Sequence, residues 1–270
     1  MERITPCSIV TGASSGIGQS LAIELAQKGH HLALMARNAT ALSDTVAHCE
    51  SHGVKVVSVI GDVSFPEDCQ KLIDSAVSAF GRIDALYNNA GISMRALFTD
   101  VDVEVLERVM RINFWGAVYC TKYALPHLLA SKGSVIGVSS VAGFKGLPAR
   151  TGYSASKFAM HGFLESLRIE NRHTGLHVLI ACPGYTASNI RKTALNAQGD
   201  TQKESPLNEK KLMSSEEVAQ HIVRAVERRR THLVLTFQGK MALLINALSS
   251  RLADWVAYRV ISKEPDSPFH

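Results

Sequence analysis

The sequence predicts an α/β fold: a doubly wound, mostly parallel seven-stranded sheet with helices on both faces, in a single domain. Three observations predict it. Short apolar runs alternate regularly with amphipathic helical stretches along the chain. Several runs, such as Val54–Ile60 and Val178–Ile180, are almost wholly apolar, as expected for parallel strands that helices cover on both faces. No linker or change of composition divides the chain before residue 185, so we expect one domain.

The first half of the chain alternates strands with helices, and glycines mark the helix ends. Gly29, Gly53 and Gly81 each follow a helical stretch, and glycine is the preferred residue just past a helix C-terminus. We expect strands at Cys7–Val10, His31–Met35, Val54–Ile60 and Ile83–Tyr87. We expect helices at Gly16–Lys28, Ala39–His52 and Pro66–Phe80.

The second half continues this alternation. The stretch from Asp102 to Ala130 is helical overall, and we expect two helices that meet near Asn113. Pro126 should end or kink the second of them, because proline lacks the backbone N–H that a helix interior needs. Ser214 and Glu217 fit a capping box at a helix start. The remaining elements are strands at Ser134–Ser139, His177–Ala181 and Leu233–Thr236, and helices around Tyr153 and at Ser215–Arg229.

Two segments depart from the alternation. Residues 186–213 are polar and aperiodic, and so long a connection predicts a substrate lid. Residues 238–262 predict a C-terminal amphipathic helix from apolar residues at helical spacing, which are Leu244, Leu248, Leu252, Trp255 and Val256. The favoured interpretation is that this helix packs on the body or on a twin subunit. The alternative is a membrane-surface helix whose basic residues face anionic lipid.

Composition argues against several classes of function. The formal net charge of +5 and the pI of about 9.0 are mild and the basic residues are scattered, so we expect no nucleic acid partner. The five cysteines form no Cys-x-x-Cys pair and the histidines no His-Glu-x-x-His motif, so we expect no metal site. The N-terminus runs straight into a strand, from which we expect no signal peptide. With reduced cysteines, this predicts a cytoplasmic protein.

A glycine-rich turn follows the first strand and is expected to bind the phosphates of a dinucleotide. The run Thr11-Gly12-Ala13-Ser14-Ser15-Gly16-Ile17-Gly18 has the glycine spacing G-x-x-x-G-x-G. Glycines permit a tight turn, and the N-terminus of the next helix offers N–H groups and partial positive charge to a pyrophosphate. The residues expected to contact the cofactor here are Gly12, Ser14, Ser15, Gly16, Ile17 and Gly18.

The end of the second strand indicates which dinucleotide binds. An NAD-binding protein would place an Asp or Glu here on the ribose hydroxyls, whereas this chain has Arg37 and Asn38. Arg37 can hold a 2′-phosphate through charge-assisted hydrogen bonds. We therefore expect both residues to contact the cofactor and to favour NADP (NADPH), with NAD as the alternative. Arg37 as a solvated loop residue is the competing interpretation.

Tyr153 and Lys157 stand four residues apart, and this spacing places them on one face of a helix. A phenol has a pKa near ~10, and an adjacent ammonium lowers it by favouring the phenolate. Such a pair can move a proton at neutral pH. A surface helix with one Tyr and one Lys would have the same spacing. The pair therefore indicates a catalytic site only together with the other motifs of the chain.

With these residues in place, the chain resembles the single-domain type of the short-chain dehydrogenase/reductase family, whose fold is Rossmann-like. The resemblance covers roughly residues 5–190 and rests on an ordered set of motifs. Ser140 stands thirteen residues before Tyr153, as the family's catalytic serine does. Ser188 departs from the pattern because many relatives carry threonine there, but the hydroxyl is retained. Further matches are Asp62 and Val63, Asn88-Asn89-Ala90-Gly91, Asn113, and Pro183-Gly184.

This resemblance implies roles for individual residues. Tyr153 is expected to exchange the proton with the substrate oxygen, Lys157 to lower the Tyr153 pKa and bind the nicotinamide ribose, and Ser140 to hydrogen-bond the substrate oxygen. Asn113 completes the catalytic set through a bound water. The remaining cofactor contacts implied are Asp62, Val63, Asn89, Ala90, Gly91, Tyr153, Pro183, Gly184, Thr186 and Ser188.

The predicted function is an NADP(H)-dependent oxidoreductase that interconverts a ketone or aldehyde and an alcohol on a largely apolar small molecule. The alternative is a catalytically silent NADP(H)-binding redox sensor, which has no need of a paired Tyr and Lys. The resemblance also implies a homodimer or homotetramer. Apolar residues expected around the substrate are Met94, Leu97, Phe144, Leu147 and Tyr185.

Overall fold

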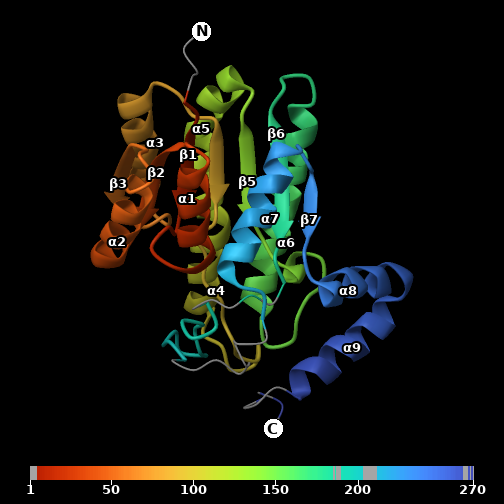
Figure 1. Cartoon of the computed structure of the whole chain (residues 1–270). Coiled ribbons are helices and arrows are strands. Elements are labelled where there is room, and N and C mark those ends of the chain that lie inside the picture. Colours follow the sequence, from red (N-terminus) through yellow and green to blue (C-terminus); the bar gives the residue numbers. More distant parts are fainter. Residues whose placement is uncertain are drawn as a thin grey trace.

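A parallel β-sheet forms the centre of the molecule (Figure 1). The computed structural model describes residues 5–184, 186, 190–202, 212–263, 267 and 269. Within them, seven strands pair in the order β3-β2-β1-β4-β5-β6-β7, and every pairing is parallel. The strands are β1 (Cys7–Thr11), β2 (His31–Ala36), β3 (Val56–Ile60), β4 (Ala85–Asn88), β5 (Ser134–Val138), β6 (His177–Cys182) and β7 (His232–Val234). The predicted fold class is confirmed.

Helices cover both faces of the sheet, which is why the central strands are buried throughout. One apolar layer joins the strands to α1 (Gly16–Gln27), α2 (Ala39–Glu50) and α7 (Ser215–Glu227). The other joins them to α3 (Pro66–Phe80), α5 (Gly116–Ser131) and α6 (Thr151–Glu170). The predicted capping box is present, since Ser214 accepts from Glu217 N and the Glu217 side chain accepts from Ser214 N.

Strand β3 does not have the environment predicted for it. The prediction of full burial over Val54–Ile60 is wrong, because β3 is an edge strand, and Ser58 and Ile60 are exposed. An edge strand pairs on one side only, so helices do not enclose it as they enclose β1. Strand β7 is also shorter than predicted, because Thr236 accepts a hydrogen bond from Gly239 N and starts the next helix instead.

The long helical stretch after β4 is one continuous helix that contains a π-helical turn. Helix α4 (Val103–Met110) passes into η1 (Arg111–Trp115), a π-helical turn, and then into α5. The predicted junction near Asn113 is this turn, and such turns are frequent at functional sites. Pro126 lies inside α5 and does not end it.

The chain reverses direction across the sheet between β3 and β4, and this reversal creates the crevice in which a ligand can bind. After β3, helix α3 carries the chain back past β1, so that β4 pairs with the other side of β1. In doubly wound sheets, ligands bind outside the carboxyl ends of the strands at such a switch point. Predicted site residues follow each of the strands β1 to β6 at this end.

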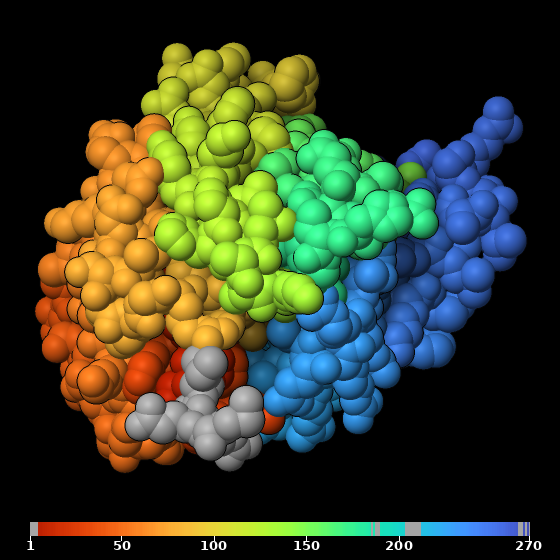
Figure 2. All heavy atoms as spheres, turned by 90° about the horizontal axis from the view of Figure 1, so that it is seen from above, coloured from red at the N-terminus to blue at the C-terminus, as the bar shows by residue number. Residues whose placement is uncertain are grey.

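The C-terminal segment is a pair of helices and not the single helix predicted over residues 238–262. Helix α8 (Phe237–Leu248) ends at Ser249, which has extended backbone geometry, with φ −157° and ψ 109°. The Ser249 hydroxyl then accepts from Leu252 N and starts α9 (Ser250–Ser262). Figures 1 and 2 show this pair standing out from the body beyond β7. Among the described helices, none is long and apolar enough to cross a membrane.

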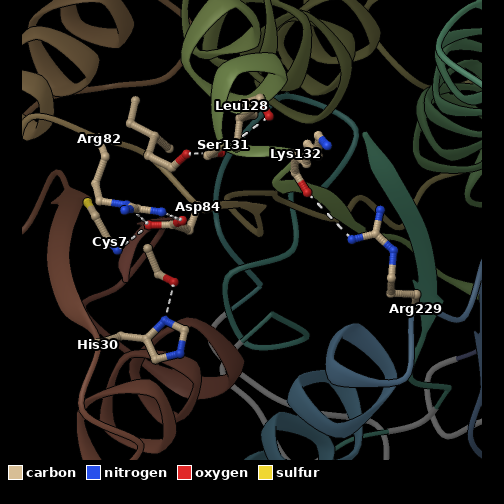
Figure 3. A network of polar contacts seen from close by, with 10 residues as sticks. Cys7, His30, Arg82, Asp84, Leu128, Ser131, Lys132 and Arg229 are labelled. Carbon is tan, nitrogen blue, oxygen red and sulfur yellow. Dashed lines mark hydrogen bonds and ion pairs between the residues drawn. The ribbon is translucent and has the colours of Figure 1, made fainter. Parts of the chain in front are cut away.

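The opposite end of the sheet, where the strands begin, is held by a polar network (Figure 3). The Asp84 carboxylate accepts from Cys7 N at 2.8 Å and from two nitrogens of Arg82 at 2.8 and 2.6 Å. The Ser131 hydroxyl donates to Ile83 O at 2.6 Å. These contacts join the starts of β1 and β4 to each other and to the end of α5, at the end of the sheet opposite the predicted site.

Candidate active site

The turn after β1 has the backbone geometry that the predicted phosphate site requires. Gly12 and Gly16 have φ values of 66° and 55°, in the left-handed region that favours glycine. A Cβ on Gly12 would lie 2.9 Å from Ala90 Cα, and one on Gly18 would overlap Gly12 O. Ser15 precedes α1 without a side-chain capping bond, so the N-terminal N–H groups of the helix face the crevice.

Thr11 and Asn89 fix this turn to the end of β4. The Thr11 hydroxyl accepts from Asn89 N at 3.1 Å and from Ala90 N at 3.0 Å. The Asn89 side chain donates to Thr11 O at 2.9 Å and to Gly12 O at 3.3 Å. The two segments predicted to hold the cofactor are therefore hydrogen-bonded to each other.

Arg37 lies at the end of β2, where it forms an ion pair with Asp62. Its Nη1 is 3.5 Å from Asp62 Oδ2, and the Arg37 side chain is 58% exposed. Asp62 is held in turn, because its N donates to Asp68 at 2.8 Å and its Oδ1 accepts from Ser64 N. Asn38 caps α2 by accepting from Ala41 N at 3.0 Å. A mostly exposed guanidinium beside the crevice leaves room for an anionic group.

Asn113, in the π-helical turn, connects the loop after β4 to α6. Its side chain accepts from Ile92 N at 2.8 Å and donates to Ile92 O and to Ser156 Oγ, both at 2.9 Å. Asn113 is fully buried. Its amide thus holds the backbone after Gly91 against the helix that carries Tyr153 and Lys157.

Tyr153, Ser140 and Lys157 meet at the mouth of the crevice. The Ser140 side chain lies close enough to the Tyr153 phenol to lower its pKa. Lys157 Nζ donates to Val138 O at 3.0 Å and lies 5.7 Å from the centre of the Tyr153 ring. Ser140 also starts the short turn η2 (Val141–Gly143), accepting from Ala142 N at 3.2 Å.

The pKa values of this group differ from the sequence-based expectation. Burial raises the pKa of Tyr153, and the nearby Ser140 side chain and the positive charges of Arg150 and Arg191 offset part of this. Burial also lowers the pKa of Lys157 to about 8. Lys157 was expected to lower the Tyr153 pKa, but it is not among the groups that do so here. Its own charged form is disfavoured by the same burial.

The predicted residues line one cleft of about 510 Å³ at the carboxyl ends of the strands. Gly18 and Asn113 lie behind its surface, where they support the turn and the loop, and Ser188 lies outside the described residues. The predicted residues in the lining are Gly12, Ser14, Ser15, Gly16, Ile17, Arg37, Asn38, Asp62, Val63, Asn89, Ala90, Gly91, Ser140, Tyr153, Lys157, Pro183, Gly184 and Thr186.

The apolar substrate residues were predicted less well. Met94 is fully buried in a small core with Val105 and Leu195, and it is not among the lining residues. Phe144 packs against the ring of His161, with 4.5 Å between ring centres, and does not line the cleft either. Leu97 and Leu147 are also outside the lining, and Tyr185 is outside the described residues.

Five lining residues from the predicted lid were missed, which are Ile190, Arg191, Thr193, Leu195 and Thr201. Arg191 is 7% exposed and donates to Thr186 O at 2.6 Å, close enough to Tyr153 for its charge to act on the phenol. Leu195 pairs with the segment after β4, since Leu195 N donates to Ser93 O and Arg95 N to Leu195 O. The segment has no hydrophobic period, so the sequence carried no signal for either contact.

Comparison with known proteins agrees with this geometry. A family model described as short chain dehydrogenase matches residues 7–199. The 11-beta-hydroxysteroid dehydrogenase A of Arachis hypogaea is 40% identical over 269 residues, covering 96% of this chain and 76% of that protein. The 11-beta-hydroxysteroid dehydrogenase-like 4A of Arabidopsis thaliana is 44% identical over 178 residues, 65% of this chain and 59% of that protein. The chain therefore spans only part of the length of these relatives.

Solved structures share the fold. A short chain dehydrogenase/reductase from Burkholderia phymatum in complex with NAD superposes with a TM-score of 0.81 at 23% identity, covering 93% of this chain and 96% of that one. An alcohol dehydrogenase from the archaeon Thermococcus sibiricus complexed with 5-hydroxy-NADP gives a TM-score of 0.74, also at 23% identity, covering 85% and 94%. The two neighbours differ in cofactor.

Proposed function

Because the chain belongs to the short-chain dehydrogenase/reductase family of oxidoreductases, we propose that it is an NADP(H)-dependent enzyme that interconverts a ketone and a secondary alcohol. The observation that carries the proposal is that Ser140, Tyr153 and Lys157 line one cleft together with the glycine turn, with Lys157 Nζ 5.7 Å from the centre of the Tyr153 ring. A proton donor and a hydrogen-bonding hydroxyl at one point suit a carbonyl oxygen that gains a proton.

The described residues fit a dinucleotide. The turn at Gly12 has no room for a Cβ, and the N-terminus of α1 faces the cleft. When bound there, the nicotinamide supplies or accepts a hydride at the substrate carbon. Tyr153 gives its proton to the oxygen in the reductive direction and takes it back in the other. Ser140 orients that oxygen, and Lys157 holds the ribose.

The preference for NADP rests on Arg37 and on the absence of an acidic residue at the end of β2, at Met35-Ala36-Arg37-Asn38. The exposed guanidinium suits a 2′-phosphate, which would compete with Asp62 for it. The substrate we propose has a bulky apolar body, because the lining includes Ile190 and Leu195 and because the relatives are named hydroxysteroid dehydrogenases. We also propose a homodimer or homotetramer, as the resemblance implies, and a cytoplasmic location, which the five free cysteines support.

A panel of ketones and secondary alcohols, hydroxysteroids included, tests the proposal when the absorbance of NADPH and NADH is followed. We expect turnover of at least one bulky substrate, and a higher kcat/KM with NADPH than with NADH. Tight binding of NADPH without turnover of any substrate would favour the redox sensor instead.

A further inference from the structure

Helices α8 and α9 carry an apolar surface that faces away from the body of the protein. On α8, Phe237, Leu244 and Leu248 stand seven and eleven residues apart, which places them on one side of the helix. All three are exposed, Leu248 by 78%. On α9, Leu252, Trp255 and Val260 are each about half exposed. We call these six side chains the outer face; so many exposed large apolar side chains on two neighbouring helices are typical of an interaction surface.

The inner side of the two helices is already occupied. Asn246 Nδ2 donates to Phe144 O at 3.3 Å, and Lys145 Nζ lies 2.6 Å from Asp254 Oδ1. Gly239 lies against Val141, and Ala253 and Ile261 of α9 are buried. The outer face is therefore not the side on which the pair attaches to η2, and Figures 1 and 2 show the pair projecting beyond the sheet edge.

The segment that forms α8 and α9 carries a net positive charge. Residues 237–263 contain four basic side chains and one acid, and that acid, Asp254, is paired with Lys145. All four basic side chains are exposed. The Arg259 guanidinium carbon lies 4.5 Å from the centre of the Trp255 ring, so one cation sits directly on the outer face. The four basic residues are Lys240, Arg251, Arg259 and Lys263.

This charge decides between two occupants of the outer face. A second copy would bring an identical basic segment against the first, and like charges oppose that contact. An anionic lipid surface attracts the same cations, while aromatic and aliphatic side chains enter the boundary between headgroups and acyl chains. We propose that the outer face of α8 and α9 binds an anionic bilayer surface, with the helices lying in the interface and not crossing it.

Flotation of the full chain with vesicles tests the proposal. With vesicles of phosphatidylcholine and phosphatidylglycerol we expect the protein to float, and with phosphatidylcholine alone we expect at least about fivefold less, a difference that salt reduces. The double variant Leu248→Glu/Trp255→Glu should lose at least about tenfold of the bound fraction. Ile169→Glu is the matched control, because Ile169 on α6 is 66% exposed.

Two triple variants that remove exposed positive charges test the proposal without introducing charges into an apolar surface. Arg251→Gln/Arg259→Gln/Lys263→Gln should remove most of the preference for anionic vesicles, whereas Lys55→Gln/Lys71→Gln/Lys122→Gln should keep it. Both sets lie at exposed positions, and circular dichroism checks their folding. Absence of flotation would overturn the proposal, as would equal binding by the two triple variants. Dimerisation through the outer face, lost in Leu248→Glu/Trp255→Glu without any flotation, would assign the surface to a second copy. None of these readouts depends on catalysis, so they stand apart from the proposed function.

Discussion

The imidazole nitrogen Nε2 of His161 lies 2.7 Å from the hydroxyl oxygen of Ser139. His161 follows Lys157 by one helical turn on α6, and Ser139 precedes Ser140 at the end of β5. A Cβ on Gly143 would meet the His161 ring, so the ring fills the space beside η2. His161 thus ties the helix that carries Tyr153 to the segment that carries Ser140. We interpret it as a positioning residue for these two side chains.

This buried histidine predicts a loss of stability in acid. Burial lowers the pKa of His161 from 6.5 to about 4. The unfolded chain therefore takes up a proton as the pH falls below 6.5, while the folded protein resists it until about 4. The stability contribution is complete above pH 6.5 and is lost as the pH falls through this window. We expect a loss of about 2 kcal/mol, after allowing for solvent screening.

Urea unfolding at about pH 7 and about pH 4 measures this loss. His161→Gln keeps a hydrogen-bonding group near Ser139 but does not titrate, so its stability should differ between the two pH values by about 2 kcal/mol less than the wild type. His48→Gln, an exposed position on α2, should behave as the wild type. If His161→Gln kept the full pH dependence, the histidine would not be its source.

Tyr153→Phe should separate proton transfer from cofactor binding. Removing the phenol oxygen takes away the proposed proton donor, so turnover should fall about 10²–10⁴-fold. The ring itself stays, and the cleft residues that hold the dinucleotide are untouched. NADPH binding, followed by fluorescence titration, should therefore change less than about threefold, well under the energy of one charged hydrogen bond. Tyr123→Phe on α5 is the control, and wild-type turnover in Tyr153→Phe would refute the mechanism.

Arg37→Gln tests the cofactor preference. Loss of the cation should weaken NADPH binding about 10–100-fold, because hydrogen bonds to a charged group contribute about 1.5–3 kcal/mol. NADH lacks the 2′-phosphate, so its Kd should change little. Equal effects on both cofactors would mean that Arg37 acts only through its ion pair with Asp62. Lys71→Gln, an exposed position on α3, controls for the change in net charge.

The sheet and the cofactor cleft could be predicted because their signals are local. Gly12 and Gly16 mark a turn that only residues without a Cβ can form, and the spacing of Tyr153 and Lys157 specifies one helix face. Parallel strands bring all their carboxyl ends to one edge, so residues far apart in sequence meet without a long-range signal.

Other features depend on neighbours that the sequence does not reveal. Arg191 contacts the site from an aperiodic segment, and Phe144 turned toward His161 instead of the cleft. The exposure of β3 follows from its place at the edge, which is a property of strand order. The break between α8 and α9 at Ser249 could not be predicted either, because Leu248 and Leu252 keep helical spacing across it.

The network at the starts of the strands should affect stability and not the site. Asp84→Asn weakens the contacts to Arg82 and Cys7 N, some of which are charge-assisted, and should cost about 1–3 kcal/mol of unfolding free energy. The network lies at the starts of β1 and β4, whereas the cleft lies at the carboxyl ends of the strands, so the Kd for NADPH should stay unchanged. Asp44→Asn, exposed on α2, should be neutral. A tenfold change in Kd for Asp84→Asn would contradict this division between the two ends.

Gly12 and Gly29 both have a left-handed backbone, but only Gly12 lies close to another segment. Comparing alanine at the two positions therefore separates the effect of backbone strain from the effect of close packing. Gly12 and Gly29 have φ values of 66° and 80°, so alanine at either position forces a left-handed conformation at a cost of about 1–2 kcal/mol. A Cβ on Gly29 meets nothing within 4 Å, whereas one on Gly12 would lie 2.9 Å from Ala90 Cα. Gly29→Ala should therefore lose stability alone. Gly12→Ala should in addition push the turn away from Asn89 and Ala90 and weaken NADPH binding by at least about tenfold, the equivalent of roughly 1.4 kcal/mol. Calorimetric titration of both variants measures the difference, and equal NADPH affinities would mean that the packing of Gly12 on β4 does not shape the cofactor site.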